Sequence, residues 1–431
     1  MSHTPDLLIV GGQIYQPGIG LGPVSDLRVR GGKIVELGSG LAPAGEQVVD
    51  ASGCLVCGGL VDLRATSGEP GNEPDEDLCS LSETAAAGGF VAVVVGPETL
   101  PANDDHAVTE LVVRRTREYG ICEVLPMGAL SERLRGESLA PMGEMAEAGA
   151  VMFGDGDRPV GNSRLLRRAM EYARSFDRPI CTQPLDAVLA AGGVMHEGVW
   201  STRLGLAGSA AAAEHIAVAR DIAIAQLTGG RLHLARISSR RSVELVRQAK
   251  QAGVAVTCAV TQWHLRLTAA ALAQYDSNLK LVAPLRDEED RRALLAGLRD
   301  GTIDAICSDH MPVGTADKQV EFDEAKPGAI GLQTAWSLVQ QCVDAGELPV
   351  AVALAALVDA PRAILRLPAA DLVPGRSATL VILDPAATWT LDQRSSRSKS
   401  QNSVLWGTQL RGQARLTLLR GRITWHADGP R

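Results

Sequence analysis

Acidic and histidine side chains that could bind a metal follow several short apolar runs of this sequence. Asp155, Asp157, His264, Asp309 and His310 each come within a few residues of such a run. A hydrolytic zinc site needs at least three protein ligands drawn from His, Cys, Asp and Glu. These residues are therefore the candidates for hydrolytic chemistry, provided that the fold brings them together.

Two arginines at similar positions argue against a metal. Arg64 and Arg236 also lie where apolar runs end, and they would place fixed positive charges where divalent ions would sit. His233 lies inside its run and is more typical of a hydrogen-bonded core histidine than of a ligand. The sequence contains no G-x-S-x-G motif and no P-loop, and no G-x-G-x-x-G follows a strand-like run. Cys54 and Cys57 form an isolated C-x-x-C, which we interpret as reduced core thiols.

The apolar runs recur eight times, and helix-like stretches fall between them. The runs begin at Leu60, Val91, Ile121, Val151, Pro179, Leu232, Val254 and Ile303, and the clearest helical stretches cover residues 162–175, 209–227, 239–251 and 287–299. Short, wholly apolar runs suit strands that are buried on both faces. Eight strands that each precede a helix predict an α/β fold, a (β/α)8 TIM barrel, over residues 58–365. In such a barrel the functional residues lie at the carboxyl ends of the strands.

The two ends of the chain have a different pattern. Residues 1–57 and 366–431 contain short paired strands separated by turn residues, which predicts one small β-sandwich-like domain made from both termini. The segment 394–403 is rich in Ser, Arg and Lys, and we expect a solvated loop there.

Composition restricts the classes of partner. The chain has 431 residues and a net charge of −8, and it has no long basic run, so we expect no nucleic acid partner. No apolar stretch reaches the roughly 20 residues of a membrane span. The first residues have no signal-peptide layout, so we expect a cytoplasmic protein.

At the same strand ends the chain resembles dihydroorotases, members of the cyclic amidohydrolase superfamily. Residues 58–71 follow the family segment P-G-x-x-D-x-H-x-H-x-R-E-P-G and keep its Asp62, Glu69, Pro70 and Gly71. Further matching segments are 88–90, 190–195, 284–286, 301–306, 308–310 and 398–403. The resemblance covers nearly the whole length and implies a barrel of the metal-dependent hydrolase type.

The departures from the family pattern fall on its metal and substrate positions. The resemblance implies that Arg64 and Thr66 replace the H-x-H pair, Gly68 the substrate arginine, Glu98 an asparagine, and Gln183 and Arg236 two further histidines, while Asp155 and Asp309 remain. We therefore expect no metal, no cofactor and no catalytic residue. We also predict that Arg64 and Arg236 form ion pairs with Asp155 and Asp309 in place of the metal.

The resemblance implies a degenerate dihydroorotase that acts as the non-catalytic subunit of aspartate carbamoyltransferase in de novo pyrimidine (UMP) biosynthesis. Such barrels associate with transcarbamoylase trimers in an assembly of six plus six chains. One alternative is an active, metal-poor cyclic amidohydrolase that uses Asp309 as general base, helped by His264 or His310. Another is a sensor that binds a small carboxylate through Arg64 and Arg236.

Overall fold

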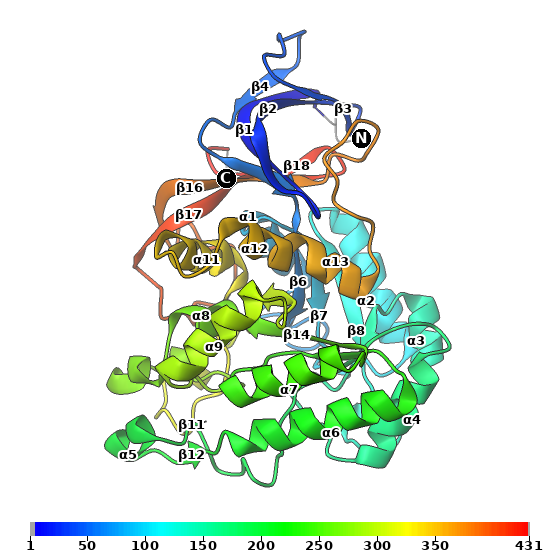
Figure 1. Cartoon of the computed structure of the whole chain (residues 1–431), viewed down its shortest axis with the longest axis vertical. Coiled ribbons are helices and arrows are strands. Elements are labelled where there is room, and N and C mark those ends of the chain that lie inside the picture. Colours follow the sequence, from blue (N-terminus) through cyan, green and yellow to red (C-terminus); the bar gives the residue numbers. More distant parts are fainter. Residues whose placement is uncertain (1–4, 430–431) are drawn as a thin grey trace.

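A parallel sheet of eight strands forms the centre of the computed structural model, which describes residues 5–429 (Figure 1). The strands are β6 (Leu60–Ala65), β7 (Phe90–Val95), β8 (Glu123–Gly128), β9 (Met152–Phe153), β10 (Ile180–Thr182), β13 (Leu232–Leu234), β14 (Val256–Thr261) and β15 (Ala305–Cys307). They pair in this chain order. Each strand begins within two residues of the start predicted from the apolar runs.

The sheet closes between its last and first strands. The backbone N–H of Ser308 donates to Asp62 Oδ1 over 2.7 Å, and the Ser308 hydroxyl donates to Asp62 Oδ2 over 2.5 Å. Ala65 and His310 also form a parallel bridge. Burial raises the pKa of Asp62 to about 7 although the hydrogen bonds from Ser308 oppose this rise. The predicted TIM barrel is confirmed.

Helices cover the outside of the barrel, as a parallel sheet requires. They include α1 (Leu78–Ala87), α2 (His106–Tyr119), α3 (Met142–Ala148), α4 (Ser163–Ala173), α6 (Ala212–Thr228), α7 (Arg240–Gln251), α9 (Glu288–Arg299), α11 (Ala335–Asp344) and α13 (Ala360–Leu365). In α4 the side chain of Asn162 caps the first turn, and apolar residues spaced three and four apart face the barrel. The helices predicted at 162–175, 209–227, 239–251 and 287–299 are thus α4, α6, α7 and α9.

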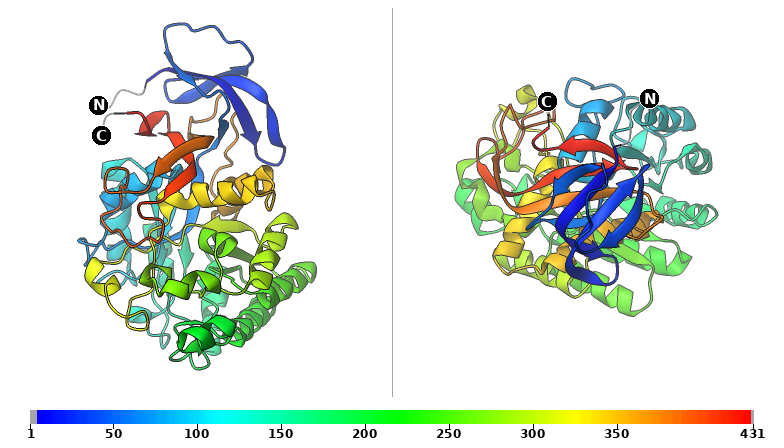
Figure 2. Two further views of the ribbon diagram at one scale, coloured as in Figure 1. Left: turned by 90° about the vertical axis from the view of Figure 1, so that its left-hand side faces the viewer. Right: turned by 90° about the horizontal axis from the view of Figure 1, so that it is seen from above.

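Strands from both ends of the chain form a second sheet. Its members are β1 (Leu7–Gln16), β2 (Gly20–Arg30), β3 (Lys33–Gly38), β4 (Gln47–Asp50), β5 (Leu55–Gly58), β16 (Leu380–Thr390), β17 (Gln409–Leu419) and β18 (Arg422–His426). β5 pairs with β16 and leads through Gly59 directly into β6. The amino-terminal end of the barrel therefore faces this small sheet, which caps one end of the molecule (Figures 1 and 2).

The expectation of a solvated loop at 394–403 holds for part of the segment, since Arg394, Lys399 and Gln401 are exposed. Ser400, Asn402 and Ser403 are buried. The Asn402 amide donates to the carbonyls of Met311 and Gly328, in the segment that follows β15. The polar composition of this segment serves backbone groups of the barrel, because a buried loop needs partners for its carbonyls.

The sequence predicted reduced core thiols and no membrane-spanning segment. All eight cysteines are free thiols and seven of them are buried, as expected for core residues. Within residues 5–429, every helix is too short or too polar to cross a membrane.

Candidate functional site at the carboxyl end of the barrel

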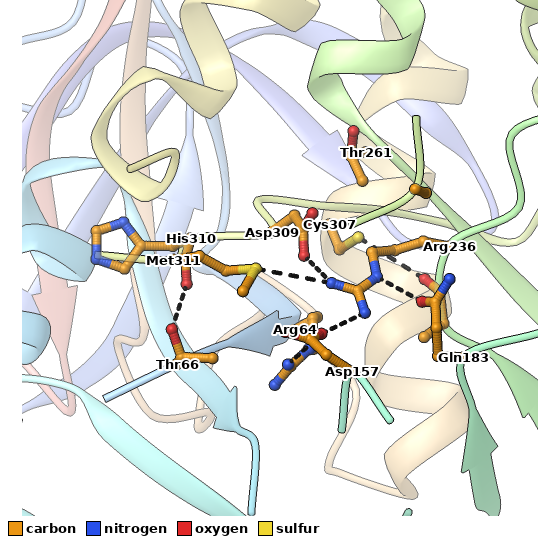
Figure 3. Close-up of polar contacts among 12 residues, drawn as sticks. Arg64, Thr66, Asp157, Gln183, Arg236, Thr261, Cys307, Asp309, His310 and Met311 are labelled. Atoms are coloured by element: carbon orange, nitrogen blue, oxygen red, sulfur yellow. Dashed lines mark hydrogen bonds and ion pairs between the residues drawn. The ribbon is translucent and has the colours of Figure 1, made fainter. Parts of the chain in front are cut away.

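Arg236 follows β13 and lies fully buried at the carboxyl end of the barrel (Figure 3). Its Nη1 donates to Asp309 Oδ1 over 2.5 Å, and its Nη2 donates to Asp157 Oδ1 over 2.5 Å. Its Nε donates to Gln183 Oε1 over 2.8 Å. One guanidinium group therefore joins the loops that follow β9, β10 and β15.

Arg64, on β6, completes the same network from the opposite side. Its Nη2 donates to Asp157 Oδ1 over 2.7 Å and to Glu98 Oε1 over 2.5 Å, and its Nη1 reaches Glu98 Oε2 over 3.2 Å. Asp157 thus bridges the two arginines. We call this set the arginine–carboxylate cluster, and it consists of Arg64, Glu98, Asp157, Gln183, Arg236 and Asp309.

Charge in the cluster is nearly balanced. Burial alone would raise the pKa of Asp157, but Arg64 and Arg236 outweigh it and hold that pKa well below its usual range. Burial raises the pKa of Glu98, and the neighbouring Asp157 carboxylate adds to the rise while Arg64 opposes it. With Asp309, three carboxyl groups face two guanidinium groups. The surplus of one carboxyl group agrees with the raised pKa of Glu98, which burial causes first and the Asp157 carboxylate increases.

Asp155 does not join the cluster, and the predicted ion pair with an arginine is wrong for this residue. Its Oδ1 accepts hydrogen bonds from the backbone N–H groups of Leu130 and Ser131 over 3.0 and 2.8 Å, and its Oδ2 accepts one from the Ser131 hydroxyl over 2.5 Å. Asp157, two residues on, takes its place beside the arginines. The segment Gly154–Asp157 turns at Gly156, which has a φ of +64°, and this turn decides which aspartate faces the barrel axis.

Two glycines make room for the ion pair of Arg64 and Glu98. A Cβ on Gly96 would lie 1.9 Å from Arg64 Nη1, and a Cβ on Gly156 would lie 1.9 Å from Glu98 Oε1. Both distances are far below van der Waals contact. The sequence reasoning missed these two positions, because a glycine after a strand is also common in ordinary turns.

Thr66 and Gly68, at two further positions of the family segment, have structural roles. The Thr66 hydroxyl donates to the carbonyl of His310 over 3.3 Å, beside the closure of the barrel. A Cβ on Gly68 would lie 1.9 Å from the carbonyl oxygen of Asn72. Neither residue contacts the arginine–carboxylate cluster through a hydrogen bond within the described part of the chain.

The histidines near the mouth are engaged elsewhere. His264 Nδ1 lies 2.7 Å from Thr261 Oγ1, its Nε2 lies 3.1 Å from the carbonyl of Ala283, and burial lowers its pKa. The His310 ring points away from Arg236 (Figure 3), and its Nδ1 accepts a hydrogen bond from the backbone N–H of Gly331 over 3.1 Å. Neither ring hydrogen-bonds to a member of the cluster.

His233 lies in the barrel wall, as predicted for a core residue. Its Nδ1 lies 2.9 Å from the hydroxyl of Thr257 on the neighbouring strand β14. Burial lowers its pKa to about 3, so the ring is neutral at physiological pH.

The donors at the mouth do not fit a zinc ion. Residues 5–429 contain no group of three or more His, Cys, Asp and Glu side chains arranged to hold a metal. The two carboxylates nearest the axis, Asp157 and Asp309, are already paired with buried guanidinium groups. The same pairing occupies both terminal nitrogens of Arg64 and all three nitrogens of Arg236, whereas the buried Nε of Arg64 has no hydrogen-bond partner among the described residues.

Comparison of the sequence with known proteins identifies the family of this chain. The Dihydro-orotase-like family profile matches residues 53–242. A "Dihydroorotase" of Syntrophotalea carbinolica is 40% identical over 97% of this chain and 99% of its own length. The chain belongs to the dihydroorotase family. Another family member, from Anaeromyxobacter dehalogenans, is 44% identical over 89% of each chain.

Solved structures agree on the fold. The L-hydantoinase (dihydropyrimidinase) of Arthrobacter aurescens superposes with a TM-score of 0.86 at 22% identity and covers 98% of this chain and 96% of its own. The dihydropyrimidinase of Brevibacillus agri gives a TM-score of 0.82 at 17% identity over 98% and 95%. At such identities the likeness shows the fold alone.

Proposed function

We propose that this member of the dihydroorotase family has no hydrolase activity and is an assembly subunit of aspartate carbamoyltransferase in de novo pyrimidine biosynthesis. Six copies would associate with six catalytic chains. The observation that carries the proposal is the arginine–carboxylate cluster, which fills the end of the barrel where ligands and substrate of an amidohydrolase would lie. The family resemblance supplies the identity of the partner.

The cluster supports a scaffold role through its energetics. A buried guanidinium is costly unless carboxylates surround it, and here two guanidinium groups have three carboxyl partners. The cluster thus joins the carboxyl ends of six strands, β6, β7, β9, β10, β13 and β15, without a metal. A barrel stabilised in this way would remain folded without a metal, and its outer surface would remain available for binding a partner chain.

Co-purification tests the partner. We would express this chain with a tag together with the aspartate carbamoyltransferase of its host, purify through the tag, and measure the mass of the product by light scattering. The expected result is a stable complex, with transcarbamoylase activity or its regulation dependent on both chains. Separate elution of the two chains and unchanged transcarbamoylase kinetics on mixing would contradict the proposal.

Turnover of dihydroorotate tests the absence of hydrolase activity. We expect the isolated chain to bind no stoichiometric zinc by elemental analysis and to show no hydrolysis above the uncatalysed rate. The matched variant Asp309→Asn separates a trace contaminant from a real site, because only a real site would lose activity on this substitution.

The alternative function is an active cyclic amidohydrolase with Asp309 as general base. Two observations favour it: the relatives bear the name dihydroorotase, and Asp309 has the left-handed φ of +47°, a backbone strain that is common at active sites. The ion pair with Arg236 opposes it, since Asp309 Oδ1 already accepts a hydrogen bond from Arg236 Nη1 over 2.5 Å. Stoichiometric zinc, or activity that Asp309→Asn abolishes, would establish this alternative.

A further inference from the structure

A cavity of about 350 Å³ lies between the amino-terminal end of the barrel and the small sheet, far from the arginine–carboxylate cluster. Its walls come from the starts of β6 and β7, the loop after α13 and the segment before β16. Three arginines line it: Arg362, Arg376 and Arg420. Its volume is within the range of small-molecule sites and exceeds what one inorganic anion needs.

Arg362 is the unusual member. Its side chain is deeply buried, with 7% of the residue exposed. Nη1 donates to the carbonyl of Val358 over 2.7 Å and Nη2 donates to the carbonyl of Gly59 over 2.6 Å. Among residues 5–429, no carboxylate oxygen lies within 4.0 Å of its guanidinium group, and burial lowers its pKa to about 10. A guanidinium has five N–H donors, so several remain available toward the cavity.

The other buried arginines have the partner that Arg362 lacks. Arg64 and Arg236 pair with carboxylates of the cluster, and Arg286 pairs with Glu214 over 2.9 Å. Burying a cation without a counter-ion is costly. Of the four buried arginines within residues 5–429, three have a carboxylate within 4.0 Å, and Arg362, which lines the cavity, has its acidic neighbours Asp359 and Glu123 farther away.

The rim of the cavity adds positive charge and hydroxyl groups. Arg376 and Arg420 are more than half exposed and form ion pairs with Asp371 and Glu123. The hydroxyl of Thr379 also lines the cavity. Among the lining residues, three guanidinium groups face two carboxylates. Asp359, whose charge also acts on Arg362, does not line the cavity and lies beyond ion-pair distance.

We propose that this cavity binds a small anionic metabolite, carrying a phosphate or a carboxylate, with Arg362 as its buried counter-ion. Arg376 and Arg420 would exchange or share their carboxylate partners to complete the anion site. Because barrel and small sheet both supply its walls, the bound anion would strengthen their contact. The site is separate from the barrel mouth and does not rest on the proposed function.

Calorimetry and thermal unfolding of the full chain test this proposal. The probes are inorganic phosphate, AMP and succinate, each compared with sodium chloride at equal ionic strength. We expect saturable binding of at least one probe below about 1 mM, with a rise in Tm that follows the occupancy. Binding of AMP or phosphate alone identifies a phosphate site, and binding of succinate alone identifies a carboxylate site.

Three variants locate the binding. Arg362→Gln should remove the anion-dependent rise in Tm, whereas Arg376→Gln and Arg420→Gln should each weaken binding about tenfold, as loss of one charge-assisted hydrogen bond predicts. Arg240→Gln, on the exposed face of α7, is the control and should leave the affinity for the anion and the anion-dependent rise in Tm unchanged. If Arg362→Gln fails to fold, the affinities of Arg376→Gln and Arg420→Gln still show whether the anion binds in this cavity. No saturable binding of any probe, or equal affinity in the rim variants, would mean that Arg362 only ties Val358 to Gly59.

Discussion

Asp157 holds two arginines with one oxygen. Its Oδ1 accepts from Arg64 over 2.7 Å and from Arg236 over 2.5 Å, although 23% of its side chain is exposed. Its loss would leave two buried cations with fewer partners, and loss of an arginine would leave buried carboxylates facing one another. The cluster therefore behaves as one unit, in which single substitutions are not additive.

Arg236→Met tests the stabilising role of the cluster. We expect a loss of about 3 kcal/mol in the free energy of unfolding, because Asp309 stays buried without a counter-ion. Urea denaturation followed by circular dichroism measures the change. Arg240→Gln, which breaks an exposed ion pair with Glu289, should cost less than about 1 kcal/mol. A loss in Arg236→Met no larger than in this control would refute the role.

Gly96→Ala tests the space that the glycines provide. The new Cβ would collide with Arg64 Nη1, so we expect a loss of about 1–3 kcal/mol in unfolding free energy from overpacking. Gly161→Ala is the matched control, because nothing lies within 4 Å of its added Cβ. Thermal unfolding of both variants distinguishes the local collision from a general effect of replacing glycine.

Sequence reasoning at the residue scale found the positions of the mouth and missed part of their geometry. Arg64, Glu98, Gln183, Arg236 and Asp309 lie together because each lies at the carboxyl end of a barrel strand or in the loop after it. Which of the two aspartates in the Gly-Asp-Gly-Asp segment faces the arginines depends on a turn with positive φ. The sequence alone does not show toward which side this turn directs each side chain. The spacing of residues also does not reveal at which glycine positions a larger side chain would not fit.

At the scale of elements, a second buried ion pair joins α6 to α7 and to the loop before α9. Glu214 on α6 accepts from the backbone N–H groups of Ser238 and Ser239, over 3.0 and 3.2 Å, at the start of α7. Arg286 pairs with the same carboxylate over 2.9 Å. Burial would raise the pKa of Glu214, but Arg286 and the hydrogen bonds from Ser238 and Ser242 outweigh it and lower that pKa to about 2.

Glu214 should make stability depend on pH. Because its folded pKa is depressed, its contribution is present above the unfolded value of about 4.3 and is lost as pH falls through about 2. The full contribution is about 3 kcal/mol. Glu214→Gln should flatten the loss of unfolding free energy between about pH 5 and pH 2 in urea titrations. An unchanged slope in this variant would contradict the assignment.

Elements were predicted best where burial decides them. The eight barrel strands are mostly apolar and mostly buried on both faces, so their starts could be located within two residues. The insertion in which β11 (Met195–His196) pairs in parallel with β12 (Gly208–Ser209) across α5 (Val199–Leu204) was not predicted, because strands of two residues carry no periodicity. Within the segment 394–403, composition did not reveal that Ser400 and Asn402 are buried and donate to backbone carbonyls instead of water.

At the scale of the whole molecule, stability should not respond to zinc. A metal that binds only the folded chain raises Tm in proportion to its occupancy. Since the donors at the mouth are paired with arginines, we expect the same Tm with chelator and with added zinc, measured by calorimetry. A zinc-dependent rise in Tm that Asp309→Asn removes would overturn the expectation of a metal-free barrel.

The small sheet can be completed only late in synthesis, because its strands come from both ends of the chain. Strand β5 is buried on its full length and needs β16 as its neighbour, but β16 is about 325 residues further along the chain. At ribosomal speeds of about 5 to 20 residues per second, β5 waits roughly 15 to 65 s with one edge open. The nascent chain thus displays an unpaired apolar strand while the entire barrel is being made. Chaperone contact during translation should therefore concentrate on the first sixty or so residues and end when β16 leaves the ribosome.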